Sequence, residues 1–169
     1  MLSVIILCGQ ASPETVVRTL APLVQASVKG LVRDVVLAGP AGSDLTLIAD
    51  HAGCAFVEAE PEAEALRCAI AVARGGDLMI FYAGHIPEAG FLEELEDLLA
   101  VGLSPAGGGH LLRATPEGFL QRLVPRLAPA VGLIAARELC SGAEIASFRH
   151  LRSLVRVQKA LRRRMRRII

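Results

Sequence analysis

The feature that most constrains the fold is a regular alternation of apolar runs and capped helical segments over residues 1–100. Leu2 to Leu7 is an apolar run with Ser3 as its one polar residue, as expected for a strand that is covered on both faces. Ser12-Pro13-Glu14 supplies an N-cap, a first-turn proline and a first-turn acid, and predicts a helix to about Ser27. Strand–helix alternation with short links predicts parallel strands with right-handed crossovers, in a three-layer, Rossmann-like α/β domain with a mostly parallel sheet.

The same pattern predicts the remaining elements. Further strands are expected at 34–38, 54–58 and 78–82, and further helices at 43–51, 61–74 and 88–100. Gly53 is expected to end the helix over 43–51. Beyond residue 102 the pattern is less regular, with an edge strand expected at 111–113, a helix at 116–126 and a buried strand at 131–135. A long helix is predicted from about residue 142 to the C-terminus.

Charge divides the chain unevenly, although its net charge is only +1. Residues 149–169 carry nine Arg and Lys and no acid, whereas residues 1–148 carry nine basic and seventeen acidic residues. We therefore distinguish an α/β body (1–148) from a basic C-terminal helix (149–169), which is either part of the same domain or an extension of it. Apolar residues recur along this helix at steps of three to four: Leu151, Leu154, Val155, Leu161, Met165 and Ile168.

Such an amphipathic basic helix has several possible partners. It could lie on an anionic membrane surface, pack against the acidic body, or pair with a second copy in a homodimer. Nucleic acid is disfavoured because the helix has no aromatic residue for base stacking. No apolar run reaches the roughly 18 residues that cross a bilayer, and the first residues lack the features of a signal peptide. We expect a cytoplasmic protein, with the inner face of the membrane as an alternative location.

Cysteine and histidine spacing indicates no metal site. Cys8, Cys54, Cys68 and Cys140 are scattered without a C-x-x-C pair, and the four histidines form no ligand pattern. We expect the cysteines to be small buried residues.

Several stretches of residues 1–100 occur in a characteristic order. They are Ser3-Val4-Ile5-Ile6 with Thr19-Leu20-Ala21-Pro22-Leu23, the segment from Asp34 to Thr46, Ala73-Arg74-Gly75-Gly76-Asp77, and Gly90-Phe91-Leu92-Glu93. The second is similar to a strand and its "DGGSSDGT" loop, the third to "ARGD" and the fourth to "PGFLE". Together they resemble a family-2-type glycosyltransferase of the GT-A fold.

That resemblance implies a nucleotide-sugar donor bound where the strands end. In the family an acid after the second strand holds the base, a D-x-D after the fourth binds a divalent metal, and a later carboxylate acts as base. Here Gly39 stands in place of the first acid, and Ala83 and His85 stand in place of the D-x-D. Glu138 is the one acid near the position of the later carboxylate.

The resemblance implies a donor site formed by Gly9, Gln10, Gly39, Asp44 and His85. His85 is the candidate catalytic residue, because it can transfer a proton near neutral pH, but it is alternatively an ordinary loop histidine. Asp44 is alternatively a helix cap, and the loop from Gly39 a plain turn. No residue is assigned as a metal ligand. Magnesium or manganese is expected only if the protein is active.

The replacement of the family's acidic residues leaves two possible functions. The first is a glycosyltransferase with altered or lost metal dependence, in which His85, backbone amides and arginines of the tail stabilise the diphosphate. The second is a catalytically inactive binding or scaffolding module, associated with the membrane or not.

Overall fold

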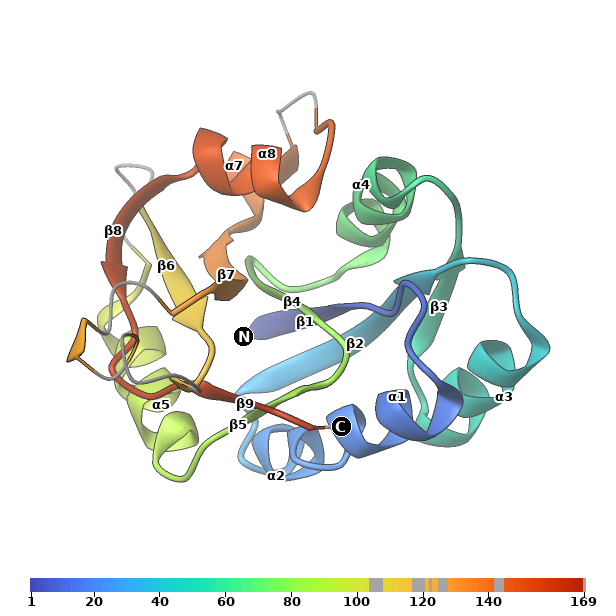
Figure 1. Ribbon diagram of the computed structural model, residues 1–169, viewed down its shortest axis with the longest axis horizontal. Coiled ribbons are helices and arrows are strands. Elements are labelled where there is room, and N and C mark those ends of the chain that lie inside the picture. Colours follow the sequence, from blue (N-terminus) through green and yellow to red (C-terminus); the bar gives the residue numbers. More distant parts are fainter. Residues whose placement is uncertain (104–107, 117–120, 122, 125–127, 142–144, 169) are drawn as a thin grey trace.

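Helices and strands alternate along the first part of the chain, and strands predominate near its end (Figure 1). The computed structural model describes residues 1–103, 108–116, 121, 123–124, 128–141 and 145–168, with only the backbone of Ser43 and of 156–159. Its strands are β1 (Leu2–Leu7), β2 (Val32–Gly39), β3 (Ala55–Glu58), β4 (Asp77–Tyr82), β5 (His85–Pro87), β6 (Gly108–Arg113), β7 (Ala130–Ala136), β8 (Arg156–Ala160) and β9 (Met165–Arg167). Its helices are α1 (Pro13–Leu20), α2 (Leu23–Val28), α3 (Ser43–Ala52), α4 (Glu62–Val72), α5 (Phe91–Val101), α7 (Arg137–Ser141) and α8 (Phe148–Leu154).

The central sheet has the strand order β3-β2-β1-β4-β7-β6-β8. Strand β1 pairs in parallel with β2 and with β4, and β2 pairs in parallel with β3. Strand β7 runs antiparallel to both β4 and β6, and β8 runs parallel to β6. The predicted α/β fold with a mostly parallel sheet is therefore confirmed.

Helices cover both faces of this sheet and make it the middle of three layers (Figure 1). Because successive side chains of a strand point to opposite faces, β1 contributes to two cores. Val4 and Ile6 pack in the core beneath α1, α2, α3 and α5, whereas Ile5 and Leu7 pack in the core beneath α4, α7 and α8. Burial on both faces explains why β1 is apolar at every position except Ser3.

The helix ends follow local signals. The Ser12 hydroxyl accepts a hydrogen bond from the Thr15 amide (3.3 Å) and caps α1. The predicted single helix over 12–27 is interrupted at Pro22, which has no amide hydrogen to continue the ladder, and α2 begins at the next residue. Helix α3 ends at Gly53, whose φ of 66° is left-handed, as predicted from the glycine.

The stretch before β4 has a structural role at the amino edge of the sheet. The buried Ser3 hydroxyl donates to the Asp34 carboxylate and accepts from the Gly75 amide (2.6 Å). The Arg74 amide donates to the other Asp34 oxygen (3.1 Å). A Cβ on Gly75 would lie 2.6 Å from the Ser3 nitrogen, so this approach requires glycine.

The predicted long C-terminal helix is wrong. Helix α8, which contains residue 149, ends at Leu154, and the chain then forms strands β8 and β9. Leu151 belongs to the core beneath α4, whereas Leu161 and Met165 belong to the opposite core. A single straight helix cannot bury its stripe on both sides of a sheet, so the apolar spacing serves two segments instead.

Predictions that rested on the C-terminal helix lose that support. Association with a membrane surface and formation of a homodimer remain predictions, but the helix no longer supports them. Within the described ranges, no helix combines the length and apolarity that a membrane crossing requires.

Three other predictions for the second part need comment. The strand predicted at 111–113 is present as part of β6, but it lies between β7 and β8, so its predicted position at the edge is wrong. Strand β5 was not predicted, because its three residues carry no strand pattern of their own. Most of the predicted helix at 116–126 lies outside the described residues. The buried strand expected at 131–135 is confirmed as β7.

Candidate functional site

The carboxyl ends of three parallel strands meet at one edge of the sheet. Leu7 at the end of β1 is paired with Tyr82 at the end of β4, and the Ala83 amide donates to the Leu7 carbonyl (3.0 Å). The Cys8 amide donates to the Ala38 carbonyl (2.8 Å), which ties the end of β1 to β2. In open α/β sheets, ligands bind in the crevice outside such strand ends.

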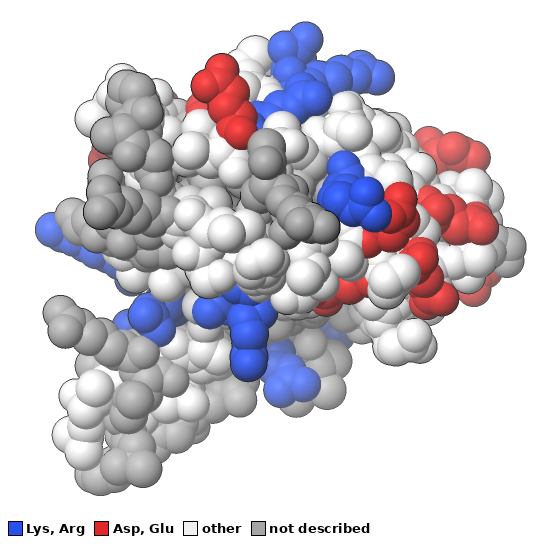
Figure 2. Space-filling model, turned by 90° about the horizontal axis from the view of Figure 1, so that it is seen from above, with Lys and Arg blue, Asp and Glu red and all other residues white. Residues whose placement is uncertain are grey.

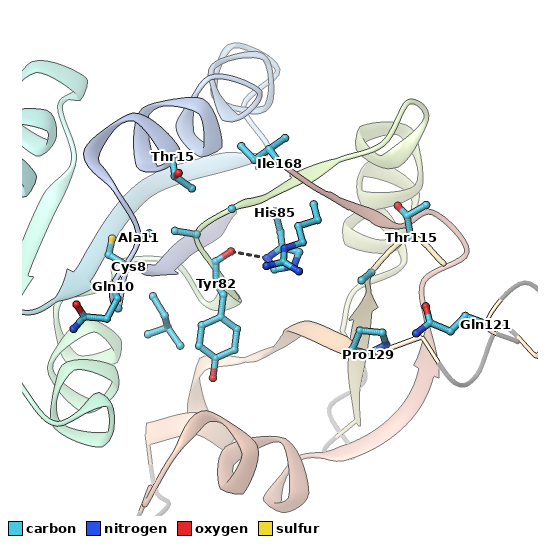
Figure 3. Close-up of a pocket in the computed structure, with 16 residues that line it drawn as sticks. Cys8, Gln10, Ala11, Thr15, Tyr82, His85, Thr115, Gln121, Pro129 and Ile168 are labelled. Atoms are coloured by element: carbon cyan, nitrogen blue, oxygen red, sulfur yellow. Dashed lines mark hydrogen bonds between the residues drawn. The ribbon is translucent and has the colours of Figure 1, made fainter. Parts of the chain in front are cut away.

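A cavity of about 520 Å³ opens at this edge (Figure 3). The loop after β1, the start of α1, the loop after β4, the segment after β6 and the last strand β9 all contribute to its lining. Its polar and charged lining residues include Gln10, Thr15, Tyr82, His85, Thr115 and Arg167. The sheet therefore gathers side chains from distant parts of the sequence into one space.

A tight turn after β4 fixes the position of His85. Gly84 has φ +87°, a conformation that other residues rarely adopt, so a side chain there would be strained. Its amide donates to the Thr19 hydroxyl (2.9 Å), and its carbonyl accepts from the Ile168 amide (2.9 Å). Helix α1 and the end of the chain thus hold the turn from two sides.

The orientation of the His85 ring is set by the strand that precedes it. Its Nδ1 atom lies 3.2 Å from the Tyr82 carbonyl oxygen (Figure 3). Since a carbonyl oxygen can only accept, Nδ1 carries the hydrogen. In the neutral ring the lone pair is then on Nε2, which gives His85 the chemistry of a proton acceptor.

Strand β9 places a second basic residue beside His85. It pairs antiparallel with β5, and Arg167 lies directly opposite His85. Both residues line the cavity. The amides of Arg162 and Arg163 donate to the Glu94 carboxylate (2.8 and 2.7 Å), which anchors the approach to β9.

The cavity carries positive charge at neutral pH. Among its described lining residues there is no Asp or Glu. Burial raises the pKa of the Cys8 thiol to about 11, so this group is uncharged. Burial, followed by the charge of Glu62, raises the pKa of Tyr82 to about 12, and this phenol too is neutral. Arg167 therefore supplies a permanent charge.

The structure distributes the predicted donor-site residues over three places. Gly9, Gln10 and His85 line the same cavity. Gly39 lines an adjoining cavity of about 210 Å³, which also contacts Gly9. Asp44 is exposed in the first turn of α3 and lines neither cavity.

The helix cap predicted at residues 43 and 44 is wrong, because Gly42 occupies the N-cap position of α3. In the first turn, the Asp44 carboxylate still has a favourable interaction with the positive end of the helix dipole.

Glu138 lies far from this cavity. It is exposed in the first turn of α7, which follows directly after β7. Ala136 at the end of β7 pairs with Asp77 at the start of β4, so this end of β7 is at the opposite edge of the sheet. The possibility that Glu138 serves as the later carboxylate is therefore wrong.

Arg167 is a lining residue that the sequence analysis did not single out. It stood among the arginines of a predicted helix, and its position depends on the pairing of β9 with β5. Thr15 and Thr115 were not predicted either. Thr115 is held by its hydroxyl, which donates to Glu88 (2.6 Å), and by its amide, which donates to the Met165 carbonyl (2.9 Å).

The residues around the turn after β4 do not fit a divalent cation. Magnesium and manganese favour several oxygen ligands, with carboxylates among them. Ala83 and Gly84 offer no side-chain ligand, and the Nδ1 atom of His85 is directed to a carbonyl. Over the described part of the chain, no group of three or more His, Cys, Asp or Glu side chains is arranged to hold a metal.

No protein-family model matches this sequence, and no curated protein matches it at a significant level. Solved structures are nevertheless similar. Glucosyl-3-phosphoglycerate synthase from Mycobacterium tuberculosis, in complex with Mn²⁺, UDP and glucosyl-3-phosphoglycerate, is 21% identical with a TM-score of 0.58, over 100% of this chain and 72% of that one.

Two further structures extend this likeness. Mannosyl-3-phosphoglycerate synthase from Rubrobacter xylanophilus is 14% identical with a TM-score of 0.63, over 95% of this chain and 65% of that one. A mannosyltransferase from Pyrobaculum calidifontis, in complex with GDP-Man and Mn²⁺, is 18% identical with a TM-score of 0.70, over 98% of this chain and 56% of that one. At these identities the likeness establishes the fold, and the chain has a GT-A-like α/β fold.

Proposed function

We propose that this protein binds a nucleotide-sugar donor in the cavity at the carboxyl ends of β1 and β4 and transfers the sugar to an acceptor. The observation that carries the proposal is the convergence of Gly9, Gln10 and His85 on one cavity at the edge where an open α/β sheet binds ligands. The similar structures include complexes with UDP and with GDP-Man, which supports this ligand class.

The reaction is an exchange of bonds at the anomeric carbon of the donor. The bond from this carbon to the diphosphate oxygen breaks, and its electron pair leaves with the diphosphate. A bond to the acceptor oxygen forms, and the acceptor proton passes to Nε2 of His85. Positive charge at the cavity stabilises the leaving diphosphate.

The experiment is titration of the protein with a panel of UDP- and GDP-sugars by isothermal calorimetry, with EDTA or with added Mn²⁺ or Mg²⁺. Donor hydrolysis is followed in parallel by NMR. We expect binding of at least one donor, and weaker binding by Gln10→Ala than by the control Gln25→Ala, an exposed glutamine of α2. Neither binding nor hydrolysis with any donor and any metal would overturn the proposal.

A second function is a non-catalytic binding module. The observation that favours it is the lack of any carboxylate among the described lining residues, which leaves His85 to accept the proton. Donor binding without hydrolysis or transfer, unchanged in His85→Gln, favours this second function. Turnover that is lost in His85→Gln while donor affinity is kept favours the transferase.

A further inference from the structure

Two adjoining cavities at the carboxyl edge of the sheet have opposite charge. The larger one carries His85 and Arg167 and, among its described lining residues, no acid. The smaller one, around Gly39, is lined by Glu60 and Glu62. Acidic side chains gather at the end of the molecule that holds β3, α3 and α4, at the right of Figure 2. An anionic group therefore has a favourable place only in the larger cavity of this pair.

The position of Arg167 is fixed by backbone contacts on both sides. The Ile168 amide donates to the Gly84 carbonyl (2.9 Å), and the Glu88 amide donates to the Arg164 carbonyl (3.0 Å). Directly opposite residues of an antiparallel pair have Cβ atoms about 5 Å apart and lie on the same face. The guanidinium therefore comes from a strand held beside His85.

We infer that Arg167 binds the diphosphate of the nucleotide ligand and supplies the positive charge that a divalent cation would otherwise provide. This inference rests on the proposed function and names the ligand group and its partner. A guanidinium carries a positive charge and donates two parallel hydrogen bonds to phosphate oxygens. The poor fit of the neighbouring residues to a cation leaves this task to the arginine.

The proposal predicts binding that needs no metal. UDP and GDP bind the wild-type protein in EDTA, and Arg167→Gln weakens the binding of the better ligand about tenfold or more. Arg167→Lys keeps the positive charge but loses the pair of parallel hydrogen-bond donors, and it binds the nucleotide with intermediate affinity. The matched control is Arg166→Gln, the same change in the neighbouring residue of β9, which is exposed and does not line the cavity. Its affinity equals that of the wild type.

Two comparisons separate the diphosphate from the nucleoside. We expect the nucleotide to displace inorganic pyrophosphate, because both ligands bind the Arg167 guanidinium. For the same reason, Arg167→Gln should bind pyrophosphate more weakly than the wild type. Uridine and guanosine, which lack phosphate, bind equally to wild type and variant. The melting temperature of each variant is measured by circular dichroism, and because Arg167 is exposed we expect no change.

Each other outcome has a defined meaning. Nucleotide affinity that is equal in wild type, Arg167→Gln and Arg166→Gln overturns the role of Arg167 and leaves the proposed function intact. Binding that requires Mn²⁺ and is indifferent to Arg167 does the same. If no nucleotide or nucleotide sugar binds, the proposed function fails. Arg167-dependent binding of pyrophosphate then still supports an anion site, and its absence removes that as well.

Discussion

The two halves of the molecule build the same sheet in different ways. In residues 1–82, strands that follow one another along the chain are separated by helices that pack on the sheet they leave. In residues 85–168, β6 pairs with β8 in this sheet, and β5 pairs with β9 in a separate two-stranded sheet, and both pairs join segments that are far apart in the sequence. The cavity combines both: the first half provides the loop after β1 and the start of α1, and the second half provides the segment after β6 and Arg167 of β9. The short-range strand–helix units form the sheet, and the long-range pairing of β9 with β5 places Arg167 at the cavity.

The largest expected effect tests whether the second half is part of the same folded unit. Met165 in β9 is fully buried, and Met165→Ala should lower the free energy of unfolding by about 2–5 kcal/mol. Urea denaturation followed by circular dichroism measures this. The control is Arg166→Ala, at an exposed neighbour, with an expected change within about 0.5 kcal/mol. Equal stability of the two variants would mean that β9 does not fold with the rest.

Gly132 in β7 tests the packing between the two halves, where β7 of the second half pairs with β4 of the first. A Cβ there would lie 2.8 Å from the Ile80 carbonyl oxygen and 2.7 Å from the Leu112 side chain, so Gly132→Ala should cost about 1–3 kcal/mol. Thermal and urea unfolding report the loss. At Gly76 a Cβ would meet nothing within 4 Å, and Gly76→Ala is the matched control. An unchanged free energy of unfolding in Gly132→Ala would show that β4 and β7 are not tightly packed at this point.

A pH series compares one buried thiol from each half. Burial raises the pKa of Cys8 and that of Cys140 from 9.0 to about 11. The unfolded chain therefore loses these protons first, and stability is complete below pH 9 and falls as the pH rises towards 11. Urea denaturation at pH 8 and pH 10 should differ by about 1 kcal/mol for each thiol.

The thiol variants serve as their own controls. Cys8→Ala and Cys140→Ala should each remove its own share of the decrease between pH 8 and pH 10. A decrease that persists unchanged in both variants would assign it to other groups. A decrease lost in only one variant would show that one half is less tightly packed around its thiol.

The smallest expected effect concerns the surface contact between the halves. Lys29 after α2 lies 3.9 Å from Glu93 and 3.8 Å from Glu96 of α5, and all three side chains are well exposed. Lys29→Gln should cost less than about 0.5 kcal/mol, and the difference should vanish in high salt. Arg33→Gln, at another exposed cation, is the comparison. A loss above 1 kcal/mol would give this contact a role that its exposure does not predict.

The sequence predicted those features whose cause is local. The apolar run of β1 and the glycine that ends α3 depend on neighbouring residues, and both were correct. His85 was expected at the mouth of the crevice because it follows a predicted strand, and it lines the cavity. Pro22 carried a signal for a helix break that the prediction of one helix over 12–27 did not use.

Features that depend on contacts between residues far apart in the sequence were not predicted. The arginine-rich tail has good intrinsic helix propensity and an apolar spacing of three to four, so a helix was the local expectation. Propensity is a weak preference, and pairing of β8 with β6 and of β9 with β5 outweighs it. The place of Arg167 could not be predicted, because nothing near it in the sequence indicates that it lies opposite residue 85.

The pairing of β5 with β9 also has a consequence for synthesis on the ribosome. A nascent chain can form β1, β2 and β4 with their helices long before Met165 to Arg167 leave the exit tunnel. Until then the described lining of the crevice lacks the Arg167 guanidinium, and the turn at Gly84 lacks its hydrogen bond from Ile168. A translation product interrupted late would keep most of the sheet and yet have no completed pocket.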